Sequence, residues 1–258
     1  MIDHIYVVNM DKDKDRLDNF QKQVNNQFEY ERVVGVDMNM PPYKNMYKEV
    51  NVNKSLKTFE WSTYLKKSPE LITNGIDTKE KATQHWIKHG QHTNRHFNRK
   101  QTITNGEHGC LQSHINIFTD AIDKEYETIL VFEDDAIFRD SWENIQKEIQ
   151  RLNTDNIMLL YLGASQHNWK KIIYKPGCYN ANRTTGTFAY MVKKPYFTYL
   201  LEKFNNRQKP VDNYLIEAQG EQPGRSIVMF PNKVICNVEH SNIHKSRNQK
   251  YTNKKFKW

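Results

Sequence analysis

The sequence is poor in cysteine and has no long apolar segment. Its 258 residues include three cysteines, Cys110, Cys178 and Cys236, which are widely spaced and form no CxxC pair. This pattern argues against a disulfide framework and against a cysteine zinc site, and it is typical of a reducing compartment. No run approaches the roughly 18 apolar residues of a membrane-spanning helix. The first residues also become charged too soon for a signal peptide, so we expect a cytoplasmic protein without membrane spans.

The composition nevertheless supports a folded core. Hydrophobic residues make up 37% of the chain and aromatic residues 12%, although the mean hydropathy is -0.87. These values predict a globular protein and exclude a disordered one. The length of 258 residues predicts one large domain or one domain with an inserted module. A formal net charge of +8 favours an anionic partner such as a nucleotide, a phosphorylated lipid, a membrane surface or a nucleic acid.

One stretch joins a long apolar run to three acids. Residues 128–138 read TILVFEDDAIF, and the first part is rich in β-branched and aromatic residues. Such a run predicts a strand buried on both faces of a sheet. The acids then have to emerge at the strand's end, where open α/β sheets bind ligands. Because side chains alternate along an extended segment, we expect Glu133 and Asp135 on one side and Asp134 on the other.

Two neighbouring carboxylates repel each other unless a cation lies between them. Mg²⁺ or Mn²⁺ carrying a diphosphate is the natural candidate, because hard cations take oxygen ligands and keep substrate phosphates in their shell. The alternative is an acidic turn after a core strand, which is common in proteins without any such site.

Strands and helices alternate along the rest of the chain. A strand over 4–9, a helix beginning near Asp13 or Asp15 and a strand over 28–37 predict a βαβ unit and favour a parallel sheet. The patterns further along predict helices at 104–123, 142–152, 195–204 and 213–218, strands at 157–163, within 174–191 and at 227–238, and a mobile basic tail at 240–258.

Residues 38–97 differ in character from their surroundings. A loop rich in Met, Pro and Asn precedes apolar residues that can form a small core between two or three short helices. Its aromatic residues Trp61, Tyr64 and Trp86 are interpreted first as core and only second as a sugar-binding surface. We therefore predict an inserted helical module at 38–97 and one main domain formed by residues 1–37 and 98–258.

Five segments occur in the order found in one enzyme family: IYVVNMDKDKDRLDNF, GEHGCLQSHINIF, ILVFEDDAIF, GTFAYMVKKPYFTYLL and KPVDNYL. Together they resemble glycosyltransferase family 25, which includes lipooligosaccharide galactosyltransferases and collagen hydroxylysine galactosyltransferases. The resemblance covers most of the chain outside the inserted module. It implies a GT-A-like (Rossmann-like) α/β fold, with a mixed sheet flanked by helices.

The resemblance also implies an activity. The donor would be a UDP-sugar, with galactose or glucose favoured, and the metal Mn²⁺ or Mg²⁺. Transfer would invert the anomeric carbon, and the acceptor would be a hydroxyl of a glycan, as in lipopolysaccharide biosynthesis, or of hydroxylysine. The Asn- and Lys-rich composition is compatible with an AT-rich viral genome, so the expected cytoplasm is bacterial or that of an infected host. Peripheral membrane contact and oligomeric state stay open.

The residues after the first strand are candidates for holding the donor. Asn9, Asp11 and Arg16 lie where a nucleoside binds at the carboxyl edge of such a sheet, and Arg16 can pair with phosphate. The alternative is a group of helix-start acids beside a solvated arginine.

The GEHGCLQSH and GTFAY motifs supply further donor-site candidates. Glu107 stands at a helix start, where it can bond a ribose or sugar hydroxyl or simply act as a helix-start acid. Ser113 and Gly186 are assigned to the donor site as well. We interpret His114 first as a packed or hydrogen-bonded residue and only second as a residue that contacts the substrate directly.

The resemblance assigns the metal ligands and the base. Glu133 and Asp135 would hold the metal, and Asp134 would contact the donor ribose or sugar. His240 would be a late third metal ligand, with His244 as the alternative. Asp212 would take the proton from the acceptor hydroxyl, as inverting transfer requires. An N-cap is the alternative for Asp212, and Glu217 is the reserve base.

Two other functions compete with this interpretation. One is a non-catalytic relative that binds glycan, against which the intact acids at 133–135 and 212 speak. The other is a basic nucleic-acid-binding protein, with tight binding that falls steeply with salt. No nucleic-acid motif supports the second, so we expect no nucleic-acid partner.

Overall fold

The computed structural model describes residues 2–43, 59–90, 103–205, 207, 209–239, 241 and 247–258. It divides the chain into two compact units, residues 1–39 with 104–258 and residues 40–103. Each unit is described by itself. His240, the expected third metal ligand, and its alternative His244 lie outside the described residues.

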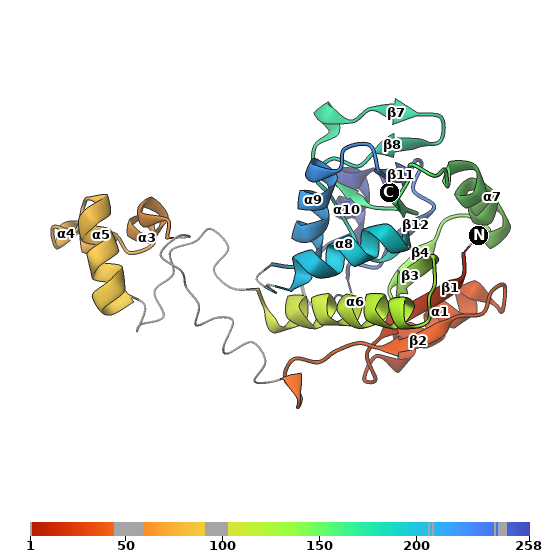
Figure 1. Cartoon of the computed structure of the whole chain (residues 1–258), viewed down its shortest axis with the longest axis horizontal. Coiled ribbons are helices and arrows are strands. Elements are labelled where there is room, and N and C mark those ends of the chain that lie inside the picture. Colours follow the sequence, from red (N-terminus) through yellow and green to blue (C-terminus); the bar gives the residue numbers. More distant parts are fainter. Residues whose placement is uncertain are drawn as a thin grey trace. The chain divides into compact units, whose positions relative to one another are not determined.

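The larger unit is built on an eight-stranded sheet (Figure 1). The strands follow the order β2-β1-β3-β10-β5-β11-β8-β7. Strand β1 is parallel to β2 and β3, and β5 is parallel to β11, whereas β10 is antiparallel to both of its neighbours. The bounds are β1 His4–Asn9, β2 Glu31–Val34, β3 Thr128–Glu133, β5 Leu159–Tyr161, β7 Tyr174–Lys175, β8 Cys178–Asn180, β10 Ala189–Lys193 and β11 Ser226–Met229.

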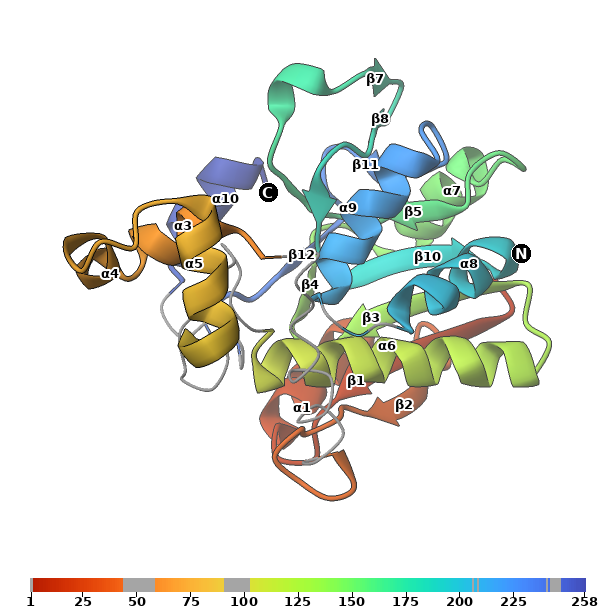
Figure 2. The ribbon, with the colours of Figure 1, turned by 60° about the vertical axis from the view of Figure 1, so that its left-hand side comes forward.

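Helices cover both faces of this sheet. Helices α1 (Lys14–Val24) and α7 (Trp142–Leu152) pack into one core with the sheet. Helices α6 (Asn105–Asp123), α8 (Lys194–Phe204) and α9 (Val211–Glu221) contact one another and lie together over a sheet face (Figures 1 and 2). The expected mixed α/β architecture flanked by helices is therefore confirmed. No helix among the described residues is long and apolar enough to span a bilayer.

The side chains of the central strands alternate between the two layers of helices. Leu130 and Phe132 of β3 join the core with α1 and α7, because alternate side chains point to opposite faces. Tyr190 and Tyr6 point to the other face, where Tyr190 contacts His114 of α6 and the Tyr6 hydroxyl donates to Asp120 of α6. Strand β3 has no polar face, as the continuous apolar run predicts.

The strand expected before the acids is confirmed, but the extended geometry expected through Glu133, Asp134 and Asp135 is wrong, because the chain turns there. Strand β3 ends at Glu133, Asp134 and Asp135 form a turn, and β4 (Ala136–Phe138) leaves the main sheet. There β4 pairs with β12 (Val234–Cys236) in a separate two-stranded sheet. Carboxylates inside a dry ladder would be costly, so the strand ends where they begin.

The last third of the chain also departs from the predictions. The strand expected over 227–238 is two strands, β11 and β12, with Pro231 between them, which cannot donate to a ladder. Two short strands, β6 (Ser165–Gln166) and β9 (Thr184–Thr185), form a third small sheet.

The basic tail is partly folded. Helix α10 (Gln249–Phe256) begins at its cap Asn248, and Phe256 is buried. The Trp258 indole packs on Phe188 and donates to the carbonyl of Ala164. The expectation of a mobile tail is therefore wrong for the described residues 247–258, because aromatic side chains anchor them to the domain.

The smaller unit has its own core. Its helices are α3 (Trp61–Lys66), α4 (Pro69–Thr73) and α5 (Lys79–His85), and α5 runs on into a π-turn at Trp86–Gly90. Tyr64, Leu65, Leu71, Ala82 and Trp86 are buried together, and Trp61 packs against them. The core interpretation of Tyr64 and Trp86 therefore agrees with their burial.

Candidate active site

Two cavities of the larger unit meet at residues 133–135, which we call the acidic turn. The first has a volume of about 200 Å³ and is lined by the ends of β1 and β2 and by the start of α6. The second has a volume of about 490 Å³ and is lined by the start of α9 and by α10. Both are lined by Cys110, Glu133, Asp135 and Ser241. The carboxylates thus stand where two ligands could approach each other.

Asp134 is held from two directions in the first cavity. The Asn9 amide donates to its Oδ2 at 2.7 Å, and the Arg16 guanidinium pairs with its Oδ1. Arg16 also lies 3.2 Å from Asp135. Burial raises the pKa of Asp134 to about 6, although Arg16 and Asn9 oppose that rise. The acids are therefore ion-paired, and they still line the cavity.

Asp135 is the least satisfied of the three acids. Its Oδ1 is buried and has no hydrogen-bond partner among the described residues. Burial and the negative charge of Glu133 raise the pKa of Asp135 to about 8, even with Arg16 alongside. The single positive charge of Arg16 does not neutralise the negative charge of the three acids. A further cation bound here would therefore be stabilised by them.

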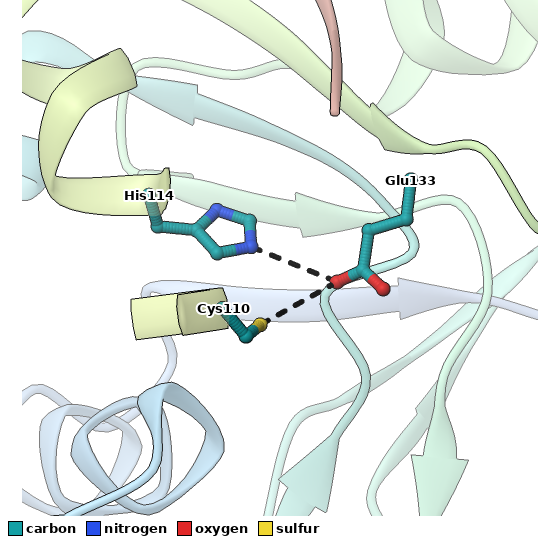
Figure 3. A group of neighbouring side chains, drawn as sticks. All are labelled: Cys110, His114 and Glu133. Carbon is teal, nitrogen blue, oxygen red and sulfur yellow. Dashed lines mark hydrogen bonds and ion pairs between the residues drawn. The ribbon is translucent and has the colours of Figure 1, made fainter. Parts of the chain in front are cut away.

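Glu133 is contacted by side chains of α6 and of the segment that precedes β10. Its Oε1 accepts a hydrogen bond from the Thr187 hydroxyl and lies 3.6 Å from His114 Nε2 and 4.0 Å from the Cys110 sulfur (Figure 3). Burial raises the pKa of Glu133, but the contacts with His114 and Thr187 outweigh it and leave the pKa below its ordinary value. Because β10 is antiparallel to β3, its approach brings Thr187 to the end of β3.

Helix α6 supplies the wall of the first cavity. Its N-terminus is closed by a capping box in which Thr104 and Glu107 bond each other's backbone N–H. The Ser113 hydroxyl accepts from the Val36 N–H at 2.9 Å, which ties the helix to the segment after β2. A Cβ at Gly109 would collide with the Val36 carbonyl, so the close approach needs glycine there.

Asp212 stands in the second cavity and is not an N-cap. The cap of α9 is Pro210, and Asp212 lies in the first turn. Its Oδ1 accepts from the Gly186 backbone N–H at 2.8 Å. Gly186 has a φ of 120°, and a Cβ there would lie 2.7 Å from the Phe188 ring. Gly186 therefore orients Asp212 through its backbone.

The structure does not bring every expected residue into the cavities. Asp11 lies outside both linings, is largely exposed and pairs with Arg32 at 2.6 Å. Glu217 also lies outside them and pairs with Lys209. Glu107 lines the second cavity and not the first, where the donor was expected.

Some site residues were missed by the sequence reasoning. Arg32 donates to the Asn9 side chain at 2.9 Å and so orients the amide that holds Asp134. Asp37 lines the first cavity; its position just after the second strand could have suggested this. Thr187 carried no such signal, because its contact depends on where β10 inserts into the sheet.

Comparison with known proteins gives partial sequence matches in mammals. The chain is 33% identical over 125 residues to the probable inactive glycosyltransferase 25 family member 3 of Rattus norvegicus, covering 45% of this chain and 21% of that protein. The inactive glycosyltransferase 25 family member 3 of Homo sapiens is 31% identical over 125 residues, covering 45% and 20%. The match thus spans about a fifth of the length of these curated relatives.

Solved structures show only distant similarity. A glycosyltransferase involved in the glycosylation of the major capsid of PBCV-1 matches with 12% identity and a TM-score of 0.41, covering 87% of this chain and 80% of that chain. Apo UDP-glucose pyrophosphorylase matches with 11% identity and a TM-score of 0.39, covering 89% and 90%. These similarities are too weak to bear on function.

The family comparison covers most of the chain. The sequence model described as glycosyltransferase family 25 (LPS biosynthesis protein) matches residues 2–215. That range contains β1, the start of α6, the acidic turn, Gly186 and Asp212. The motifs that resembled this family in the sequence therefore stand around one pair of cavities, and the chain belongs to glycosyltransferase family 25.

Proposed function

We propose that this protein is an inverting, metal-dependent glycosyltransferase that moves a hexose from a UDP-sugar to a hydroxyl of a glycan or of hydroxylysine. The observation that carries the proposal is the meeting of the two cavities at Glu133 and Asp135. A donor in the first cavity and an acceptor in the second would face each other across these acids.

The first cavity suits a nucleotide diphosphate. Asp37 offers a carboxylate for a nucleoside at the carboxyl edge of β1 and β2. Asn9, whose amide is held by Asp134 and the Asp13 carbonyl, orders that edge. Arg16 stands beside these residues, and its guanidinium can exchange part of its pairing with Asp134 and Asp135 for a donor phosphate. Asp134, held by Asn9, would accept from a ribose or sugar hydroxyl.

The acidic turn fits a divalent cation. The unpartnered Oδ1 of Asp135 and the raised pKa of this carboxyl both indicate a deficit of positive charge. Glu133 and Asp135 would hold Mn²⁺ or Mg²⁺, since both offer the oxygen ligands that hard cations prefer. When bound, such a cation supplies charge stabilisation for the diphosphate leaving group.

Asp212 would act on the acceptor. Its carboxylate lines the second cavity, and the Gly186 N–H fixes one of its oxygens. In this position it would take the proton from the attacking hydroxyl while the bond to the diphosphate breaks on the opposite side of the sugar carbon. Glu217 is a poorer candidate, because it pairs with Lys209 outside the cavities.

A non-catalytic relative is the second candidate. The observation that favours it is the name of the matched proteins from rat and human, which are called inactive. Such a protein would keep the cavities and bind a ligand without turning it over.

Donor hydrolysis separates the two candidates. A thermal-shift screen of nucleotide sugars with and without Mn²⁺ first identifies a donor, because a ligand that binds only the native state raises its melting temperature. The identified donor is then incubated with the protein and Mn²⁺, and release of UDP is measured. Slow release that stops in EDTA supports the transferase. Binding without any release, with or without acceptors, supports the non-catalytic relative.

A further inference from the structure

Cys110, His114 and Glu133 form a cluster of three potential metal ligands beside the acidic turn (Figure 3). Cys110 and His114 lie four residues apart on α6 and therefore on one face of the helix. Glu133 approaches them from the end of β3. One ligand atom from each residue lies within 4.8 Å of the others.

The His114 imidazole is oriented as a metal-binding histidine would be. Its Nδ1 is 2.7 Å from the Tyr190 hydroxyl, and the ring is almost completely buried. Its Nε2 is buried without a hydrogen-bond partner among the described residues, because Glu133 Oε1 at 3.6 Å is too far for a hydrogen bond. In the tautomer whose Nδ1–H donates to Tyr190, which is the form that can bind a metal, the lone pair of Nε2 points into the cluster. An outer partner of this kind fixes the tautomer of histidines that bind metals.

The separations are close to those of a tetrahedral zinc site. Zinc bond lengths to sulfur, nitrogen and oxygen place neighbouring ligand atoms about 3.3 to 3.6 Å apart. Glu133 Oε1 lies 3.6 Å from the His114 nitrogen and 4.0 Å from the Cys110 sulfur. For these two pairs a few tenths of an ångström of closure would be enough, and the Cys110 sulfur and the His114 nitrogen lie within 4.8 Å of each other. The set of thiolate, imidazole and one carboxylate suits a softer cation than Mn²⁺ or Mg²⁺.

We propose that Cys110, His114 and Glu133 bind Zn²⁺ or a cation of similar softness, which inhibits the enzyme by occupying Glu133. Binding replaces the thiol proton of Cys110, which leaves to solvent, and a water completes the tetrahedron. The site is reachable, because Cys110 and Glu133 line both cavities. Inhibition rests on the proposed function of Glu133, whereas the binding itself does not.

Cobalt(II) tests the ligand set directly. Added to the full-length protein without donor or acceptor, Co²⁺ should produce the near-ultraviolet charge-transfer absorption of a cobalt–thiolate bond, and one equivalent of Zn²⁺ should abolish it. The band should persist in Cys178→Ser and Cys236→Ser and disappear in Cys110→Ser. No band in the wild type, or a band that survives in Cys110→Ser, would overturn the proposal.

A second measurement needs no substitution at the site. Zinc bound to a thiolate protects it from alkylation, so Zn²⁺ should slow the reaction of Cys110 with iodoacetamide by about tenfold or more. Mass spectrometry reads the rate for each cysteine, and Cys236, which also lines the second cavity, is the internal control. Equal slowing of both cysteines, or none, would contradict the site.

The two proposals fail in different ways. If the protein binds neither UDP-sugar nor Mn²⁺ but shows the cobalt band, the transferase assignment is wrong and the soft-metal site stands. If it transfers sugar with Mn²⁺ but shows no band, the soft-metal site is wrong. If both hold, Zn²⁺ added to the Mn²⁺-loaded enzyme should inhibit transfer and weaken the binding of UDP-sugar, because Glu133 is then no longer available to Mn²⁺.

Discussion

At the scale of single residues, the carboxylates of the cleft differ in what holds them. Asp134 is paired on both oxygens, Glu133 is held at Oε1, and Asp135 keeps one buried oxygen without a partner in the described chain. Asp212 lines the second cavity and is held by the Gly186 backbone N–H. These differences are the reason for proposing separate tasks for acids whose chemistry is the same.

Asp212→Asn tests the assignment of the base. The amide oxygen can still accept from Gly186, so the geometry should survive while the proton acceptor is lost. We expect kcat for transfer to fall by about 10²- to 10⁴-fold, with the affinity for UDP-sugar unchanged. Glu217→Gln on the same helix is the matched control and should retain kcat. Full turnover in Asp212→Asn would exclude this residue as the base.

Thr187→Val tests the orientation of Glu133. The change keeps the shape of the side chain and removes the hydroxyl that donates to Oε1. The affinity for Mn²⁺ should weaken by about 10- to 100-fold, as for other outer-shell partners of metal ligands. Thr185→Val is the control, since its hydroxyl bonds to His167 and to the Ser165 carbonyl instead. Titration of Mn²⁺ into both variants gives the comparison, and equal affinities would show that Thr187 has no such role.

The acids were predictable from the sequence, whereas their partners were not. Glu133 to Asp135 follow a continuous apolar run, and local physics is enough to place charges at the end of such a strand. Thr187 and Tyr190 reach the site because β10 inserts antiparallel between β3 and β5. That insertion depends on long-range pairing, which no local pattern encodes.

At the scale of elements, the main surprise is α10. Its lysines and lack of a long apolar run suggested a solvated tail, yet Phe256 is buried and Trp258 packs on Phe188. Phe188 directly follows Thr187, so the C-terminal residues brace the segment that holds Glu133. Two aromatic side chains determine that this segment packs on the domain. A composition averaged over many residues does not reveal the contribution of two side chains.

Phe256→Ala tests whether α10 is part of the fold. Removing a buried ring should lower the free energy of unfolding by about 3 kcal/mol and reduce the melting temperature. Tyr251→Ala on the same helix is the control, because Tyr251 is 67% exposed. Chemical denaturation of both variants supplies the values. Equal stabilities would mean that α10 is not packed in solution.

At the scale of the whole molecule, the chain consists of two units with separate cores. The ends of the larger unit that flank residues 40–103 are close together, because the Asn105 amide donates to Asn39 at 2.7 Å. The sequence predicted an insertion at 38–97 from the change in composition. Its boundaries could not be placed more closely, since loop residues carry little periodic signal.

Replacing residues 40–103 with a short Gly/Ser linker tests the proposal that they are an insertion. Since Asn39 and Asn105 are in contact, a few residues can join the larger unit without strain. The shortened protein should unfold in one cooperative transition near the melting temperature of the larger unit. Loss of any cooperative transition would show that the larger unit depends on the smaller one.

We propose that the acidic turn holds a divalent cation and that this cation in turn holds a nucleotide sugar. Calorimetric titration of UDP into the full-length protein, with Mn²⁺ and again with EDTA, tests it most directly. In the wild type Mn²⁺ should tighten UDP binding by about tenfold or more, and in Asp135→Asn this dependence should disappear. UDP binding that is the same with Mn²⁺ and with EDTA, or that keeps its Mn²⁺ dependence in Asp135→Asn, would contradict the account.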